Sequence, residues 1–232
     1  MVLSGAIVNG VGIVVGTTLG LVLHKIPEKV KETAMHGIGL AVILIGLQMA
    51  IQSQSIIVVL VSLLLGAVVG EGLNIEGKIE RLGNWLESKT KSESNVSKGF
   101  MTSSLIFVIG AMSIVGALDS GIRGDHSVLF TKSILDGFVA LILTTTLGIG
   151  VIFSVVPVVM YEGLIALFAT QIDQFVSQSF LDMLIVELTA TGGLLILAIG
   201  LNLLNIIKIR VANLLPSLLF VGFVLYGYLQ FT

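Results

Sequence analysis

Apolar stretches of about twenty residues recur along nearly the whole chain, and short polar segments separate them. A helix of about twenty apolar residues crosses the hydrocarbon core of a bilayer. Lipid offers no partners for backbone N–H and C=O groups, so each span must satisfy them internally as a helix. The sequence therefore predicts an all-α integral membrane protein with about seven or eight transmembrane helices. The predicted spans are residues 5–23, 35–52, 55–72, 99–118, 133–153, 158–174, 183–206 and 212–231.

Composition excludes several functional classes. Hydrophobic residues make up 55% of the 232 residues and charged residues 11%, which is too little polar surface for a water-soluble globule. The net charge of −2 gives no basis for nucleic-acid binding, and the absence of cysteine excludes disulfides and thiolate metal sites. The three histidines are far apart, and the chain has no phosphate-binding loop and no nucleophile elbow. We expect no metal, no cofactor and no enzyme activity.

The basic residues predict the orientation of the spans. Lysines and arginines follow the first span, follow the third span and precede the last, so these three loops should face the cytoplasm. The connections at 52–54 and 171–182 contain neither residue, and the one at 119–132 mixes both signs of charge, which suits the outside. Both termini are then outside. The first residues lack the features of a signal peptide, so we expect 5–23 to be a retained span. The basic residues are Lys25, Lys29, Lys31, Lys78, Arg81, Lys89, Lys91, Lys98, Lys208 and Arg210.

Residues 74–98 are the only clearly hydrophilic stretch. Isoleucines at helical spacing, such as Ile75 and Ile79, indicate an amphipathic helix. It either lies in the membrane interface, with Trp85 at headgroup level, or links the spans as a helix facing water. Residues 89–98 are predicted to be a cytoplasmic loop.

The two ends of the chain align as an internal repeat. Asn9-Gly10 matches Glu162-Gly163, Gly39-Leu40 matches Gly193-Leu194, and Ile45-Gly-Leu-Gln48 matches Ile199-Gly-Leu-Asn202. Five spans separate matched segments, so the two triplets would run in opposite directions. Inverted repeats of this kind are common in secondary transporters, with the site near the midplane. The predicted parts are a first repeat (1–73), a cytoplasmic helix and loop (74–98), a central two-span hairpin (99–153) and a second repeat (154–232).

The sixth span leaves an alternative open. Residues 158–174 are short for a crossing and carry Glu162, so the segment either spans the membrane or re-enters on one side. A re-entrant segment would change the direction of every later span, and the repeat would no longer be inverted.

Most of the unexplained polarity lies in residues 110–137, within the central hairpin. Charge is costly at membrane depth, so this cluster indicates a pathway or binding site. Lys132 and Asp136 share a helical face and form either a structural ion pair or a site for a cation or proton. The glycines and serines fit either an unwound, ligand-binding helix end or a turn and close packing. The candidate residues here are Ser113, Asp119, Ser120, Arg123, Asp125, Lys132, Ser133 and Asp136.

Polar residues in the repeat spans complete the candidate set. Asn9, Gln48 and Asn202 either line a shared cavity or form hydrogen bonds between helices. Glu162 and Glu187 are carboxylates within apolar spans, and such a group protonates or finds a partner, so either can serve a proton-linked site.

The run Gly110-Ala-Met-Ser-Ile-Val-Gly116, with Gly124-Asp125 and Lys132-Ser-Ile-Leu-Asp136-Gly137 after it, resembles the signature of the bacterial YdfK/YqgA type of membrane protein. The N-terminal Gly-Ala-Ile-Val-Asn9-Gly10 and the Gly-Glu71-Gly turn are similar as well, so the resemblance covers almost the whole chain. This family is a domain of unknown function. The resemblance implies a multi-pass protein of the bacterial inner membrane, described only as a candidate transporter, and it supplies neither a substrate nor catalytic residues.

Two functional hypotheses follow. The first is a secondary transporter or ion-conducting protein for a small solute or ion, with Asp136 as the principal charged ligand or proton carrier. The second is a non-transporting scaffold or sensor, whose polar hairpin and residues 74–98 bind a protein partner. Small-residue helix faces also suit a homodimer within the lipid bilayer.

Overall fold

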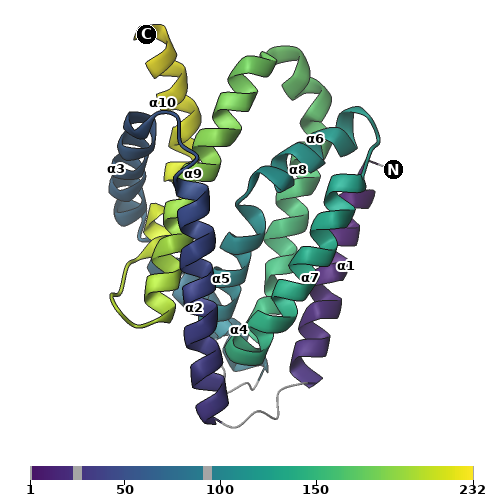
Figure 1. Ribbon diagram of the computed structural model, residues 1–232, viewed down its shortest axis with the longest axis vertical. Coiled ribbons are helices and arrows are strands. Elements are labelled where there is room, and N and C mark those ends of the chain that lie inside the picture. Colours follow the sequence, from purple (N-terminus) through teal and green to yellow (C-terminus); the bar gives the residue numbers. More distant parts are fainter. Residues whose placement is uncertain (1, 23–27, 91–95, 232) are drawn as a thin grey trace. The chain divides into compact units, whose positions relative to one another are not determined.

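The computed structural model describes residues 2–22, 28–90 and 96–231, which form ten α-helices and two 3-10 segments and contain no strand (Figure 1). Lys25 and residues 91–95 of the predicted cytoplasmic loop lie outside the described residues. The elements are α1 (Ser4–Val22), α2 (Glu28–Ala50), α3 (Ile56–Leu73), α4 (Ile75–Thr90), α5 (Val96–Val108), α6 (Ala111–Ile122), α7 (Ser127–Leu147), η1 (Gly148–Ser154), α8 (Val155–Phe175), α9 (Gln178–Leu203), η2 (Val211–Leu214) and α10 (Ser217–Phe231).

Among these residues, six helical stretches are long and apolar enough to cross a membrane, and the bent pair α5 and α6 can count as a seventh span. One of the six runs from Ser127 to Phe175, and its 49 residues are more than twice the length of about 20 needed for one crossing. It divides at Gly148, where φ is 72° and α7 gives way to η1 and then α8. The predicted all-α membrane architecture is confirmed.

The helix bounds differ from the predicted spans in the central hairpin. The predicted span 99–118 is not one straight helix, because α5 and α6 are bent by 61° at the break between them. Gly110 lies in the break with φ 153°, a conformation that residues with a Cβ rarely adopt. The sixth predicted span corresponds to α8, which has 21 residues. A re-entrant segment was an alternative because the predicted span was short, whereas α8 is long enough for one crossing.

The chain divides into two compact units. Unit 1 comprises Met1–Ala34 and Leu82–Ser177, and unit 2 comprises Met35–Arg81 and Gln178–Thr232. Each unit therefore combines segments from both halves of the predicted repeat.

In unit 1, glycines allow α1 and α7 to run side by side at close range (Figure 1). Gly12 faces Ser133 and Gly16 faces Gly137, so a step of four residues along α1 matches a step of four along α7 in the same direction. The two helices are parallel. A Cβ on Gly16 would lie 1.9 Å from the carbonyl oxygen of Gly137, which leaves room only for glycine. Packing of small residues is the usual basis of close helix contact in membranes.

In unit 2, helices α2 and α9 cross through four glycines. A Cβ on Gly46 would lie 2.7 Å from the carbonyl oxygen of Gly193, and one on Gly200 would lie 2.9 Å from that of Gly39. Gly39 and Gly193 are matched in the sequence repeat, as are Gly46 and Gly200. Replacing each residue of the Gly46–Gly193 contact by its match in the repeat gives Gly200 and Gly39, which are the other contacting pair. This reciprocity is typical of a twofold relation. The helices are antiparallel, as an inverted repeat requires.

Helices α3 and α10 of unit 2 are also antiparallel. Val58, Val221 and Leu225 form a buried apolar cluster between them, and Gly66 approaches Ser217 further along. The residue number rises along α3 as it falls along α10, so this pair follows the same inverted arrangement as α2 and α9.

Candidate ion-binding site

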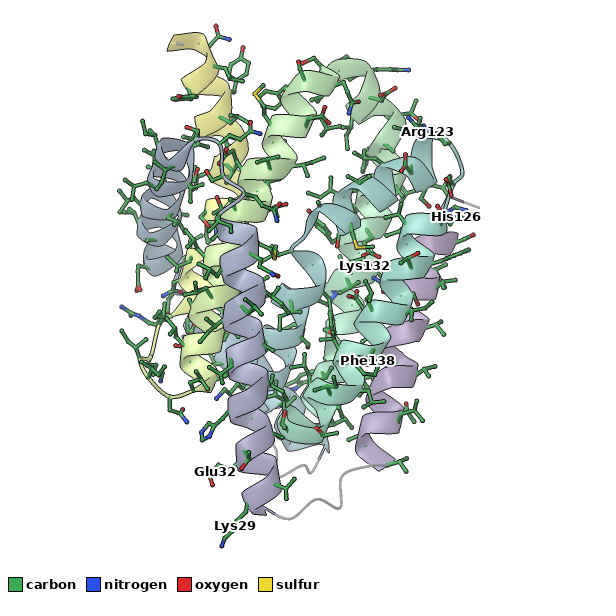
Figure 2. All side chains as sticks on the ribbon, viewed as in Figure 1. Lys29, Glu32, Arg123, His126, Lys132 and Phe138 are labelled. Atoms are coloured by element: carbon green, nitrogen blue, oxygen red, sulfur yellow. The ribbon has the colours of Figure 1, made fainter. Side chains whose placement is uncertain are left out.

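Helix α7 carries two charged residues, Lys132 and Asp136, on its buried face. Lys132 is 6% exposed and Asp136 is 8% exposed, whereas Ile134, Leu135 and Phe138 on other faces are exposed apolar side chains. Residues four apart share a helix face, so the sequence of α7 alone places the lysine and the aspartate together. Figure 2 shows Lys132 partway along this helix, away from the end of unit 1 where Arg123 and His126 lie.

Four buried side chains from three helices meet at this face. The buried quartet consists of Asn9 on α1, Lys132 and Asp136 on α7, and Glu162 on α8. The Nδ2 atom of Asn9 donates to both carboxylates, at 2.9 and 3.1 Å from the two oxygens of Glu162 and 3.1 Å from Oδ2 of Asp136. The ammonium of Lys132 forms an ion pair with Asp136 and lies 3.4 Å from Oε1 of Glu162.

The quartet lies against the break in the central hairpin. Lys132 Nζ donates to the carbonyl oxygen of Phe107 at 2.8 Å, and Ser113 Oγ donates to the same oxygen at 3.1 Å. Phe107 is in the last turn of α5, where carbonyls lack a partner within the helix and carry the negative end of its dipole. An ammonium is a favourable partner there. Broken helices whose ends face a charged site are typical of transporter binding sites.

The charges of the quartet do not balance. Lys132 contributes one positive charge, and Asp136 and Glu162 contribute two negative charges when both are ionised. An uncompensated charge away from water is costly, so the site favours one additional positive charge. One amide atom is also unsatisfied: Oδ1 of the fully buried Asn9 has no hydrogen-bond partner among the described residues.

No group of three His, Cys, Asp or Glu side chains in the described part of the chain could hold a metal ion. Two carboxylates that share one ammonium can also share one proton or one small cation.

Three predicted residues lie near the turn between α6 and α7, outside the quartet. Ser120 is fully buried, and its Oγ donates to the carbonyl of Val2 at 3.0 Å and also bonds to His126 Nδ1. Asp119 and Arg123 form an ion pair at 3.4 Å, with the arginine side chain 75% exposed. The bond from Ser120 to Val2 joins the segment before α1 to α6, and the other two contacts are local to the turn.

Two further candidates have local partners. The backbone N–H of Ser127 donates to Asp125 Oδ1 at 2.9 Å, and this bond lowers the pKa of the exposed aspartate. Ser133 Oγ donates to the carbonyl of Val8 at 2.8 Å and joins α7 to α1 beside the quartet.

Glu187 of α9 has a full set of partners within unit 2. Its carboxylate accepts from Ser53 Oγ at 2.7 Å and from the backbone N–H groups of Gln54 and Ser55 at 2.8 and 2.9 Å. These groups immediately precede α3, and a carboxylate at a helix N-terminus is stabilised by the unpaired N–H groups and the dipole. Glu187 therefore caps α3 from a neighbouring helix.

The other repeat-matched amides, Asn202 and Gln48, belong to unit 2. The Asn202 side chain bonds both the N–H and the carbonyl of Ile209, at 2.8 and 2.7 Å, and closes the turn after α9. The Gln48 side chain is exposed on α2. Of the three matched amides, the structure brings only Asn9 to the charged residues.

Sequence reasoning missed one member of the site, the carbonyl of Phe107. Its side chain is apolar and carries no signal. The neighbouring Gly110 and Ser113 did carry one, because an unwound helix end was one of the two alternatives predicted for the glycines and serines of this segment.

Comparisons with known proteins agree with the membrane architecture. The family described as "Protein of unknown function (DUF554)" matches residues 4–226. The chain is 33% identical to the uncharacterized membrane protein YdfK of Bacillus subtilis (strain 168), over 93% of this chain and 92% of that protein. It is 30% identical to the uncharacterized protein YqgA of Escherichia coli (strain K12), over 93% of each chain. No solved structure matches the chain.

Proposed function

Since this chain belongs to the DUF554 family of membrane proteins, we propose from its buried quartet that it is a secondary transporter or ion-conducting protein for a small solute or ion. The observation that carries the proposal is a lysine and two carboxylates, all at least 92% buried, that meet against a broken helix. Ionisable residues at membrane depth usually mark ion or proton pathways.

Each member of the quartet has a role in this proposal. Asp136 and Glu162 hold the transported or coupling charge between α7 and α8. Asn9 holds both carboxylates in place from α1. Lys132 neutralises one negative charge and links the carboxylates to the carbonyl of Phe107, beside the break between α5 and α6. A change in charge at the site would therefore alter a hydrogen bond at this break.

The repeat supports the same class of function. Antiparallel, reciprocal contacts between matched helices are the arrangement found in inverted-repeat transporters, where the site lies at the repeat interface. Asn9 and Glu162 are matched positions and bond to each other within the site. We propose the plasma membrane of bacteria as the location, with both termini outside.

A non-transporting scaffold or sensor is the second candidate, and the exposed surface of α4 favours it. Trp85 on this hydrophilic helix is 56% exposed, and an aromatic side chain in such a position can anchor a protein partner or lie at the lipid headgroups. In this alternative the quartet only stabilises unit 1, and the small-residue faces serve a homodimer.

Flux into proteoliposomes separates the two candidates. The wild-type chain would be compared with Asp136→Asn and Glu162→Gln for protons, monovalent and divalent ions, and a panel of small organic solutes. Asp173→Asn is the matched control, because Asp173 is exposed near the end of α8. Transport predicts a flux that falls at least about tenfold in both site variants, since removing a charged ligand costs 1.4 kcal/mol or more, and that is unchanged in the control. Equal flux in all four folded proteins, or no flux together with a stable co-purifying partner, would contradict transport.

A further inference from the structure

We infer that the buried quartet binds one small alkali cation, Na⁺ or Li⁺, in competition with the ammonium of Lys132. The inference rests on the proposed function, because it names the ion class for the same site. Its test, however, is a binding measurement that does not depend on flux.

The oxygens that hold the ammonium are those that a small hard cation prefers. Lys132 Nζ contacts Oδ2 of Asp136, Oε1 of Glu162 and the carbonyl oxygen of Phe107. These three oxygens come from α7, α8 and α5, and they are two carboxylates and the carbonyl end of a broken helix. Carboxylate and carbonyl oxygens are the ligands of hard cations, and broken-helix carbonyls bind Na⁺ in transporters. The ammonium therefore occupies a ready-made cation position.

Asn9 offers a fourth oxygen. Its Nδ2 lies within 3.1 Å of both carboxylates, so the amide is directed into the cluster, while its Oδ1 has no partner. A half turn of the amide exchanges the two atoms, because they have nearly the same size and lie at the ends of one planar group. With a cation present, the carboxylates no longer need the N–H donors, and Oδ1 can turn to the cation. The unsatisfied oxygen of a fully buried side chain is then accounted for.

The charge of the site selects a monovalent ion. With Lys132 charged and both carboxylates ionised, one monovalent cation brings the quartet to neutrality, whereas a divalent ion would leave one positive charge in excess. Burial penalises either imbalance. The lysine side chain has a flexible four-carbon stem, so its ammonium can move away from the three oxygens that it contacts while its charge stays near the carboxylates.

The test is the thermal unfolding of the purified full chain in detergent, in NaCl, LiCl, KCl or choline chloride at one ionic strength. We expect Na⁺ or Li⁺ to raise Tm relative to choline in proportion to the logarithm of its concentration above Kd, by about 5 °C or more at about 100 times Kd. Equal Tm values in Na⁺, Li⁺ and choline would overturn the inference. This comparison uses only the wild-type chain, so it does not depend on any variant folding.

Three variants assign the effect to the quartet. Glu162→Gln should weaken Na⁺ binding, measured by titration calorimetry, at least tenfold. Lys132→Gln should strengthen it at least tenfold, because the competing ammonium is gone. Asp173→Asn should leave Kd unchanged. A folded Lys132→Gln protein that has lost its Na⁺ response, or a Glu162→Gln protein that keeps it, would contradict competition at this site.

Flux measured on the same preparations distinguishes this inference from the proposed function. Na⁺ binding without any flux would support the cation-site inference and contradict the proposed transport function. Proton or solute flux without Na⁺ or Li⁺ binding keeps transport and overturns the cation site.

Discussion

Asn9 donates from Nδ2 to both carboxylate oxygens of Glu162, and the two residues are equivalents of each other in the two halves of the repeat. A residue that contacts its own equivalent lies close to the twofold axis relating the halves. The charged site of unit 1 is thus built around a contact between two positions that the sequence alignment pairs, one holding an amide and the other a carboxylate.

An exchange of these two residues tests that relationship. Asn9→Glu alone adds a third carboxylate to the buried cluster and should destabilise the protein by about 3 kcal/mol or more. Asn9→Glu combined with Glu162→Asn keeps one amide and one carboxylate at the contact and should recover most of that loss. Unfolding in detergent with increasing denaturant gives both values. A double variant less stable than Asn9→Glu would show that the two positions are not interchangeable.

Gly16→Ala should destabilise unit 1, because the added Cβ would lie 1.9 Å from the carbonyl oxygen of Gly137 and must push α1 from α7. Overpacking of this kind costs about 1–3 kcal/mol, observed as a fall in Tm. Gly37→Ala in α2 is the matched control, since no atom lies within 4 Å of the added Cβ. The control should be neutral or stabilising by about 0.5–1 kcal/mol, because alanine is the better helix former. A Gly16 variant as stable as the control would contradict the close crossing.

Lys132→Met should lower the free energy of unfolding by about 3–5 kcal/mol, because two buried carboxylates lose their cation. Addition of Asp136→Asn should restore part of the loss by removing one of the unpaired charges. The exposed pair of Arg210 and Glu71, 2.9 Å apart, is the reference. Arg210→Met should cost only about 0–1 kcal/mol. Equal losses in Lys132→Met and Arg210→Met would mean that water reaches the quartet.

Glu187→Gln should loosen the start of α3, because an amide nitrogen cannot accept the hydrogen bonds that the carboxylate receives from Gln54, Ser55 and Ser53. The expected loss is about 1–3 kcal/mol, with faster hydrogen exchange at the N–H groups of residues 54 and 55. Glu80→Gln, on the exposed part of α4, should change neither measurement. Unchanged exchange at residues 54 and 55 would argue against the cap.

The predicted orientation can be tested directly, because the chain contains no cysteine of its own. Single cysteines at Asp173 and Asp125 should react with a membrane-impermeant maleimide in intact cells, since both lie in connections predicted to be outside. A cysteine at Ser88 should react only after the membrane is opened, because positively charged segments stay in the cytoplasm. All three positions are exposed. Labelling of Ser88→Cys in intact cells would reverse or refute the predicted topology.

The sequence was sufficient to predict the helical membrane fold and the face shared by Lys132 and Asp136. Both depend on short-range rules, namely the length of apolar runs and the helical period. The repeat alignment also paired Asn9 with Glu162, although it could not show that they touch. An alignment shows which residues occupy equivalent positions in the two halves of the repeat. Whether two equivalent residues touch depends on how close they lie to the twofold axis that relates the halves.

Other parts of the site depend on tertiary packing and could not be predicted. The break in the fourth predicted span depends on the conformation of Gly110, which glycine allows but does not require. Asn202 and Glu187 had the same signal as Asn9 and Glu162, a polar residue in an apolar span. In the structure, Asn202 bonds to the backbone in the turn after α9, and Glu187 bonds to backbone N–H groups at the start of α3. One sequence alone does not distinguish such backbone contacts from a binding site.

The reciprocal glycine contacts of α2 and α9 have a consequence for how such a chain can arise. An antiparallel crossing in which Gly39 meets Gly200 and Gly46 meets Gly193 is the contact that one helix would make with an upside-down copy of itself. A polypeptide with the sequence of only one half would have to insert into the bilayer in both orientations to form this crossing. Joining the two three-span halves through an even number of crossings, here the two spans of the central hairpin, gives one copy of each orientation in every molecule. The two copies can then differ in sequence, as at positions 9 and 162, which hold an amide and a carboxylate.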